Sequence, residues 1–355
     1  MRERVVQSNS VWQLKDAIAS PVRQTLALAG TAIACVALLG ATPAQARHAR
    51  YTPPHGHIWH GVSDTGFAKD FRVFNRRVGA HSALLHSFGH WGGEHVLGGL
   101  HRWQKTHTRG VLSISTAPGD EPELISPGRI ARGFGDGYIL ELNRLIARSG
   151  QVVYIRLFGE MNGHWNPYCA YTASGRAKGG SHSTAWFRKA FARVYLLSHG
   201  GPAVGVSAQL HRLGLPPVRA DLALNPYPTL RVIWNPQAEG SPNVAGNSPQ
   251  AYYPGDKYVD IVGNDIYDIG FRPQWAANDR LYRAHPSKPY AFPEWGLWGI
   301  DDPAFIRAMA KFVKGHRRVE LLSWFNGQAA GGTFDIATKP RSRAAYRSLI
   351  TPLGR

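Results

Sequence analysis

Short apolar runs alternate with longer amphipathic stretches along most of the chain, which predicts strands separated by helices. Eight apolar runs have the length of buried strands, and they are His57–Val62, Ser82–Ser87, Val111–Ser115, Val152–Phe158, Arg231–Trp234, Val259–Ile266, Pro289–Phe292 and Leu321–Trp324. Helices are predicted at Asp136–Ser149, Thr184–His199, part of Pro249–Lys257, Asn278–Ala284 and Pro303–Lys314. Strands that alternate with helices build a parallel sheet, and eight of them close a barrel. We therefore predict the α/β class and a single (β/α)8 TIM barrel domain.

Two segments rich in Pro and Gly interrupt this alternation. Gly200–Thr229 lies before the fifth predicted strand, and we interpret it as an insertion on the barrel, either a lid or a packed excursion. Gly240–Ser248 follows the same strand and is predicted to loop over the carboxyl ends of the strands.

The N-terminus has the features of a secretory signal peptide. Basic residues precede an apolar run from Thr25 to Ala41, and Ala44–Ala46 offers a small-residue cleavage site, so residues 1–46 are predicted to be the signal. An uncleaved membrane anchor is the main alternative, and a lipoprotein attached through Cys35 is a weaker one. Residues 47–56 then form a lead-in segment and residues 57–355 the barrel, with its insertion at about 200–229. We expect a secreted protein, extracellular or in the cell envelope.

The chain is strongly basic, with a formal net charge of +18. Its basic residues are scattered and no binding motif surrounds them, so no nucleic-acid partner is expected. The charge does allow loose retention on an anionic cell envelope. Cys169 is the single cysteine after residue 46, which excludes an intramolecular disulfide and a multi-cysteine metal site in that part. A large core must supply the stability, and a monomer is expected.

Two predicted strands end in a glutamate beside Gly and Trp. Glu160 follows the fourth strand, within the segment Arg156–Trp165, and Glu294 follows the seventh, within Pro293–Gly296. Residues at the carboxyl ends of barrel strands face one mouth, so the two carboxyl groups are predicted to meet there. Glycoside hydrolysis requires such a pair, one protonated and one ionised. A structural ion pair between Arg156 and Glu160 is the alternative interpretation, and the two are compatible.

Further candidates for substrate contact lie close to these strand ends. Tyr267 leaves the sixth strand and is placed to donate a hydrogen bond to the nucleophile, and Trp324 ends the eighth strand, where it would form a floor under a sugar ring. His90 and Trp91 are predicted to line the sugar-binding end of the cleft, with a solvated or core position as the equal alternative. The substrate-binding candidates are Arg156, Asn162, Trp165, Tyr267, Trp324, His90 and Trp91.

The segment from Arg156 to Trp165 reads R-L-F-G-E-M-N-G-H-W and resembles the acid/base motif of glycoside hydrolase family 26, which contains β-mannanases and related endo-β-glycanases. Tyr253–Tyr267 resembles the sixth-strand signature of that family, and Pro293–Gly296 resembles its nucleophile segment. The resemblance implies a (β/α)8 barrel that cleaves a β-linked polysaccharide, β-mannan first, with retention of anomeric configuration.

By this resemblance Glu160 is the general acid/base, Glu294 the nucleophile and Tyr267 the partner of the nucleophile. Arg156, Trp165 and Trp324 match positions that shape the cleft, and no cofactor or metal is required. Two positions differ from the family pattern. Gly159 stands where His is common, and Pro293 and Trp295 flank Glu294 where small or apolar residues and Phe are more usual. Retention predicts a carboxyl separation of about 5–5.5 Å.

Two other functions remain open at this point. A carbohydrate-binding pseudoenzyme would keep the same cleft and lack turnover. A metal-dependent barrel hydrolase would use His55, His57 and His60 near the first strand, but it would need further ligands on later strands. The eighth strand ends in Trp324–Asn326 and supplies no Asp for that purpose.

Overall fold

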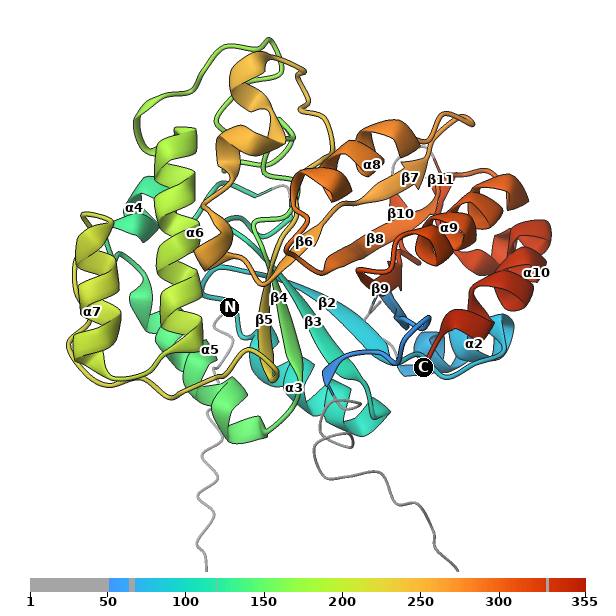
Figure 1. The fold of residues 1–355 in the computed structure, drawn as a ribbon, viewed down its shortest axis with the longest axis horizontal. Coiled ribbons are helices and arrows are strands. Elements are labelled where there is room, and N and C mark those ends of the chain that lie inside the picture. Colours follow the sequence, from blue (N-terminus) through green and yellow to red (C-terminus); the bar gives the residue numbers. More distant parts are fainter. Residues whose placement is uncertain (1–50, 64–67, 120, 330–331) are drawn as a thin grey trace, which may run out of the picture. The chain divides into compact units, whose positions relative to one another are not determined.

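The chain folds into a closed barrel of parallel strands surrounded by helices, as a computed structural model shows (Figure 1). The structure describes residues 51–63, 68–119, 121–329 and 332–355. The predicted signal peptide therefore lies outside the described residues, as do residues 47–50 of the lead-in segment. No helix in the described part of the chain combines the length and the apolar character needed to cross a membrane.

The strands of the barrel are β1 (Trp59–Ser63), β2 (Leu84–His90), β3 (Arg109–Ser115), β4 (Val153–Leu157), β5 (Leu230–Trp234), β6 (Ile261–Gly263), β7 (Ile266–Asp268), β8 (Tyr290–Leu297) and β9 (Val319–Trp324). A short hairpin, β10 (Gln328–Ala329) and β11 (Gly332–Thr333), follows β9. The helices are α2 (Ala68–Val78), α3 (His95–Thr106), α4 (Pro127–Ala131), α5 (Asp136–Ser149), α6 (Thr184–His199), α7 (Ala203–Arg212), α8 (Trp275–Ala284), α9 (Pro303–Gly315) and α10 (Pro340–Leu349). Single 3₁₀ turns lie at Gly180–His182, Ala245–Asn247, Pro249–Tyr252, Asp256–Tyr258, Ile336–Thr338 and Thr351–Leu353.

The eight predicted strands are confirmed. Each strand from β1 to β5 pairs in parallel with the next, β6 pairs with β8, β8 pairs with β9 and β9 pairs with β1, so the barrel closes. The sixth predicted strand is split into β6 and β7 at Asn264 and Asp265, where the chain leaves the ladder. This break turns Asp265 and Tyr267 toward the mouth of the barrel.

Local signals explain the best-predicted helices. The Ser183 side chain accepts a hydrogen bond from Trp186 N at the start of α6, and the Asp302 side chain does the same from Ala304 N at the start of α9. Helix α5 ends at Gly150, which has the left-handed conformation that favours glycine. The predicted partial helix at Pro249–Lys257 is instead two 3₁₀ turns.

Side chains of alternate strand residues face two different cores. Leu84, Val111, Tyr154 and Ile233 belong to an apolar cluster that fills the barrel, together with Trp59, Ile261, Ala291 and Leu321. The residues between them, such as Leu85, Leu112 and Val153, pack in the larger cluster formed with the helices. This is the inside and outside alternation of a barrel strand.

The segment Gly200–Thr229 contains α7, which packs on α6 on the outside of the barrel (Figure 1). It joins the end of α6 to the start of β5, so it lies toward the amino ends of the strands. Asn225 fastens it there, donating from its side chain to Asn143 O and Ser198 O at 3.0 Å each. These contacts describe a packed excursion, and none of the lining residues of the cavities at the strands' carboxyl ends comes from it.

Candidate active site

A polar layer lies directly above the apolar filling of the barrel. Two residues beyond Leu84, Val111, Tyr154 and Ile233 along their strands stand His86, Ser113, Arg156 and Asn235. All four are buried. Because buried polar groups require partners, these residues are connected by hydrogen bonds. The two glutamates contact residues of this layer.

Glu160 occupies a tight turn just after β4. Its backbone has φ of 55°, in the left-handed region that non-glycine residues rarely adopt, and Phe158 has φ of 50°. Glu160 N donates to Asn235 O at 2.7 Å, which holds this turn against the end of β5. The Glu160 carboxylate accepts a hydrogen bond from Trp165 Nε1 at 2.9 Å and another from the Gln237 side-chain amide. Its position and direction are therefore fixed from two sides.

Glu294 lies within β8 and is held by three different groups. Arg156 Nη1 is 2.8 Å from Glu294 Oε1, and the Tyr267 hydroxyl donates to Oε2 at 2.5 Å. The backbone N–H of Glu294 donates to Asp265 Oδ1 at 3.0 Å. Asp265 also pairs with Arg156 and accepts from Asn235 Nδ2 at 2.9 Å. One cation and one phenol hydroxyl thus contact the two oxygens of the Glu294 carboxylate.

Both glutamates line one cavity of about 590 Å³, which also contains Arg156 and Trp165. Burial and the nearby charge of Glu294 raise the pKa of Glu160 above its ordinary value. Burial and Glu294 also raise the pKa of Tyr267, which therefore stays protonated and able to donate. The site combines a carboxyl group whose pKa is raised with a second carboxyl group that a cation and a phenol contact. That is the division of roles expected of an acid and a nucleophile.

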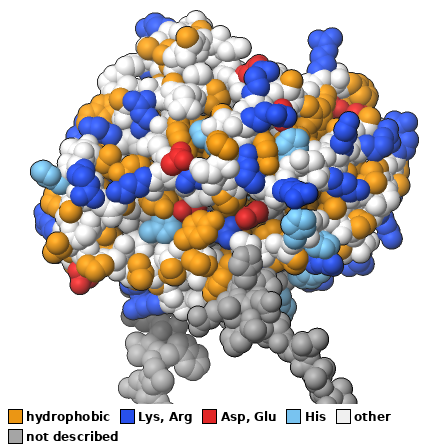
Figure 2. Space-filling model, viewed as in Figure 1, with side chains coloured by type: hydrophobic (Ala, Val, Ile, Leu, Met, Phe, Trp, Pro, Cys, Tyr) orange, Lys and Arg blue, Asp and Glu red, His pale blue; other side chains and the backbone are white. Residues whose placement is uncertain are grey.

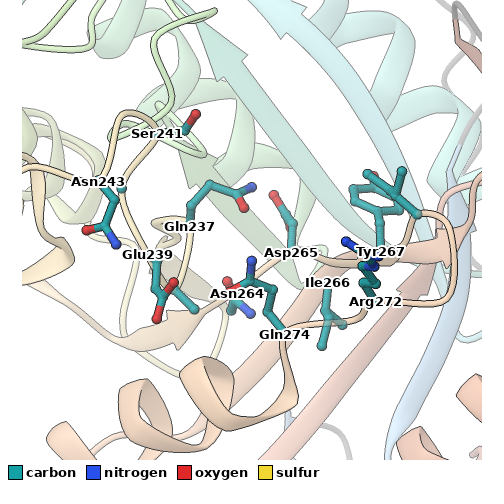
Figure 3. Close-up of a pocket in the computed structure, with 13 residues that line it drawn as sticks. Gln237, Glu239, Ser241, Asn243, Asn264, Asp265, Ile266, Tyr267, Arg272 and Gln274 are labelled. Atoms are coloured by element: carbon teal, nitrogen blue, oxygen red, sulfur yellow. The ribbon is translucent and has the colours of Figure 1, made fainter. Parts of the chain in front are cut away.

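A second cavity of about 540 Å³ is lined by residues that contact the two glutamates (Figure 3). Gln237, which contacts Glu160, and Tyr267, which contacts Glu294, both line it. Figure 3 shows Gln237, Asp265 and Tyr267 around its inner end, with amide side chains such as Asn243, Asn264 and Gln274 nearby. The two glutamates therefore line one cavity, and the side chains of Gln237 and Tyr267 connect them to the second.

The absence of a side chain at Gly159 is required by Arg156. A Cβ atom at position 159 would lie 2.3 Å from Arg156 Cζ and 2.5 Å from Nη2. The guanidinium occupies the space that any other residue would fill, and from there it reaches Asp265 and Glu294. The glycine that departs from the family pattern thus has a local structural reason.

Three of the predicted substrate contacts are corrected by the structure. Trp324 is fully buried, packs in the helix-facing core beside Trp295 and Tyr346, and donates from Nε1 to Phe334 O at 3.1 Å. The next residue, Phe325, points the other way and lines a cavity of about 500 Å³ at the mouth. The prediction of a sugar floor at Trp324 was wrong, because the side chain lies on the outer face of its strand.

Trp91 and Asn162 are likewise buried and are absent from the cavity walls. Trp91 stacks on Phe158 with ring centroids 6.1 Å apart, beneath the Glu160 turn. The Asn162 side chain accepts from Gln237 N at 2.8 Å and donates to Gln237 O at 2.9 Å, which fixes the residue that contacts Glu160. Both residues therefore position residues of the site without lining its cavities. His90, by contrast, does line the cavity that holds the carboxyl pair.

Several functional residues escaped the sequence interpretation. Gln237, two positions after Asn235 at the exit of β5, has the signal of a polar residue at a strand end. Phe88 is 40% exposed, lines two of the mouth cavities and contacts Phe325 edge-on at 5.9 Å. Such an exposed aromatic ring is suited to packing on the C–H face of a sugar.

The histidines near the first strand lie elsewhere. His55 and His57 line a separate cavity with Lys314, next to the starts of β1 and β9 and so at the amino end of the barrel. Within the residues that the structure describes, no three His, Cys, Asp or Glu side chains are grouped as a metal site requires. On the face seen in Figure 2, Lys and Arg side chains are spread out and form no continuous patch.

No family model matches the chain, and no curated protein matches it. Its structure is similar to the mannanase BCman of Bacillus subtilis, with a TM-score of 0.55 and 16% identity over 83% of this chain and 86% of that one. It is also similar to the GH26 β-mannanase BoMan26A of Bacteroides ovatus, with a TM-score of 0.52 and 15% identity over 84% and 89%. GH26A of a Muricauda species gives a TM-score of 0.52 and 16% identity over 81% and 88%. At these identities the likeness shows the shared barrel fold.

Proposed function

We propose that the chain is a retaining β-glycoside hydrolase in which Glu160 is the acid/base and Glu294 is the nucleophile. The proposal rests on one observation: two carboxyl groups in one cavity have different environments. Burial and Glu294 raise the pKa of Glu160, whereas Arg156 and Tyr267 contact both oxygens of Glu294. Only a reaction that needs one proton donor and one anion makes use of this difference.

In the first step, the Glu160 carboxyl group gives its proton to the glycosidic oxygen as the bond from that oxygen to the anomeric carbon breaks. A Glu294 oxygen attacks the anomeric carbon and forms an ester. Tyr267 and Arg156 keep Glu294 ionised and aimed until the attack. The Trp165 indole, bonded to Glu160 Oε2, holds the acid in line with the leaving oxygen.

In the second step, Glu160 is a carboxylate and takes a proton from water. The water oxygen attacks the anomeric carbon, the ester bond breaks and Glu294 leaves as a carboxylate again. Two inversions at one carbon give net retention. No cofactor or metal ion takes part in either step.

The proposed substrate is a β-linked polysaccharide, with β-mannan first. The resemblance of the Arg156–Trp165 segment and the mannanases among the structural neighbours support this choice. The cavity that holds the carboxyl pair and the second cavity lined by Gln237 and Tyr267 leave room for more than one sugar unit. The exposed rings of Trp165 and Phe88 supply apolar surfaces for sugar rings. Export by the N-terminal signal is proposed as well, since a polymeric substrate is met outside the cell.

The test is a panel of purified polysaccharides, including β-mannan, β-1,3-xylan and mixed-linkage β-glucan, scored by the release of reducing ends. The wild-type chain is compared with Glu294→Gln and Glu160→Gln. We expect release from at least one β-glycan and a loss of at least about 10³-fold in Glu294→Gln, with oligosaccharide binding retained. Binding without any release by the wild type would favour the pseudoenzyme instead. Release that survives Glu294→Gln would remove Glu294 from its role.

A further inference from the structure

We propose that Ser113 and His86 form a buried hydrogen-bond relay that positions the nucleophile Glu294, in addition to the residues that touch it. The inference rests on the proposed glycosidase function. Neither side chain contacts Glu294, so both are positioning residues. Their contacts connect β2, β3, β4 and β8, whose ends surround the mouth of the barrel.

His86 is fully buried and its two ring nitrogens have different partners. Nδ1 lies 3.0 Å from Pro293 O, a carbonyl that can only accept, so Nδ1 must carry the proton. In a neutral ring Nε2 is then an acceptor, and it lies 2.7 Å from the Ser113 hydroxyl. Burial and the neighbouring Arg156 charge hold the pKa of His86 well below its ordinary value, which keeps the ring neutral.

Ser113 connects this ring to the arginine. Its hydroxyl proton is directed to His86 Nε2, which leaves the oxygen lone pairs for Arg156 Nη1 at 3.0 Å. The same Nη1 atom is 2.8 Å from Glu294 Oε1. The two protons of this nitrogen are therefore divided between Ser113 and Glu294, and Ser113 sets the rotation of the guanidinium.

The relay also holds the backbone of the nucleophile. The peptide bond that precedes Glu294 is fixed on both of its polar atoms, because Pro293 O accepts from His86 and Glu294 N donates to Asp265. Asp265 in turn is paired with Arg156. A closed ring of contacts thus runs from the Glu294 backbone through His86, Ser113 and Arg156 to the Glu294 carboxylate.

Removal of the Ser113 hydroxyl opens this ring without touching Glu294. The charged and titratable groups that face Glu294 in the described part of the chain are Arg156 from β4, Tyr267 from β7, Asp265, Glu160 and Tyr168. Of these, Arg156 is the one that Ser113 contacts directly. A looser guanidinium no longer holds the Glu294 carboxylate in position for attack on the anomeric carbon, so kcat falls while KM changes less.

The experiment compares Ser113→Ala with Ser323→Ala on the best substrate of the wild type. Ser323 is a fully buried strand serine whose hydroxyl has no hydrogen-bond partner in the described part of the chain. Each variant is measured for kcat and KM across pH, on the natural glycan and on an aryl glycoside with an activated leaving group. Thermal unfolding of both variants identifies a general loss of folding.

We expect Ser113→Ala to lower kcat about 10- to 100-fold, the range for hydrogen bonds to a charged group, with a smaller change in KM. The loss should persist on the activated substrate, because a good leaving group replaces the acid but not the nucleophile. Ser323→Ala should match the wild type in kcat and pH profile. A loss in Ser113→Ala that appears in KM and not in kcat, or a loss that disappears on the activated substrate, would overturn the proposal.

A measurement without substrate separates this proposal from the proposed function. In ¹⁵N-labelled wild-type protein, NMR of His86 should show a neutral ring with the proton on Nδ1 and an accepting Nε2 whose shift changes in Ser113→Ala. The opposite tautomer, or an Nε2 chemical shift that is the same in Ser113→Ala and in the wild type, would contradict the relay. If the relay is present and the wild type still cleaves no glycan, the proposed function fails by itself.

Discussion

Gly159→Ala tests whether Arg156 needs the space beside Gly159 to reach its partners in the site. The new Cβ would lie 2.3 Å from Arg156 Cζ, whereas ordinary contact begins at 3.4 Å. The guanidinium would have to retreat by about 1.1 Å, the difference between these two distances. Arginine side chains move easily in general, but this one is held by Asp265, Glu294 and Ser113.

The cost follows from the contacts that such a retreat breaks. The contact of Arg156 with Glu294, now 2.8 Å, would stretch to about 3.9 Å, beyond hydrogen-bond reach. A hydrogen bond to a charged group contributes about 1.5–3 kcal/mol, and a buried charge that loses its partner costs about 3–5 kcal/mol. We expect kcat/KM to fall by at least about 100-fold and the free energy of unfolding to fall by about 2–5 kcal/mol.

The assay is steady-state hydrolysis together with urea unfolding of wild type, Gly159→Ala and Gly137→Ala. Gly137 lies in α5 with open space around its Cα, so an added methyl group there should leave activity unchanged and raise stability slightly. Wild-type kcat/KM in Gly159→Ala would refute the reasoning, because it would mean that Arg156 need not occupy this space.

Three further outcomes follow from the same structure. Tyr267→Phe removes the 2.5 Å hydrogen bond to Glu294, so kcat should fall about 10- to 100-fold; a wild-type kcat would contradict the assigned partnership. The raised pKa of Glu160 means that the folded chain binds this proton more tightly than the unfolded chain does. The protonated carboxyl group therefore contributes to the free energy of unfolding below pH 4.5, the ordinary pKa. That contribution is lost as the pH rises through the pKa of Glu160 in the folded chain. Glu160→Gln lacks this dependence, so its Tm relative to wild type should increase with pH, and a parallel pair of Tm curves would refute the burial argument. Trp324→Phe should cost about 1–3 kcal/mol of stability and leave KM within about twofold, whereas a large rise in KM would restore Trp324 as a sugar contact.

The barrel could be predicted because its strands are short apolar runs with clear boundaries. Some helices could be predicted from the sequence and others could not. Helix α9 has Asp302 and Pro303 at its start, but α3 has no side-chain cap and contains Gly98 and Gly99, both poor helix formers. Such a helix forms because one face packs on the barrel, and a single sequence does not show that contact.

The acidic pair was predictable for the same reason as the strands, since Glu160 and Glu294 stand at strand ends. The inner or outer direction of each side chain was not. In Leu321–Phe325 nearly every residue is apolar, because a parallel barrel strand is buried on both faces, so no alternation shows that Trp324 points outward and Phe325 inward. Gln237 and Ser113 could not be assigned either, because their roles depend on contacts between strands distant in sequence.

The central claim, double displacement by Glu160 and Glu294, is tested most directly by the stereochemistry of the first product. Proton NMR of the anomeric signals should be recorded during the first turnovers on a β-linked oligosaccharide, before mutarotation mixes the anomers. The account predicts that the β-anomer appears first and the α-anomer grows in later. The α-anomer as the first product would contradict it, since a single displacement by water leaves no role for Glu294 as a nucleophile.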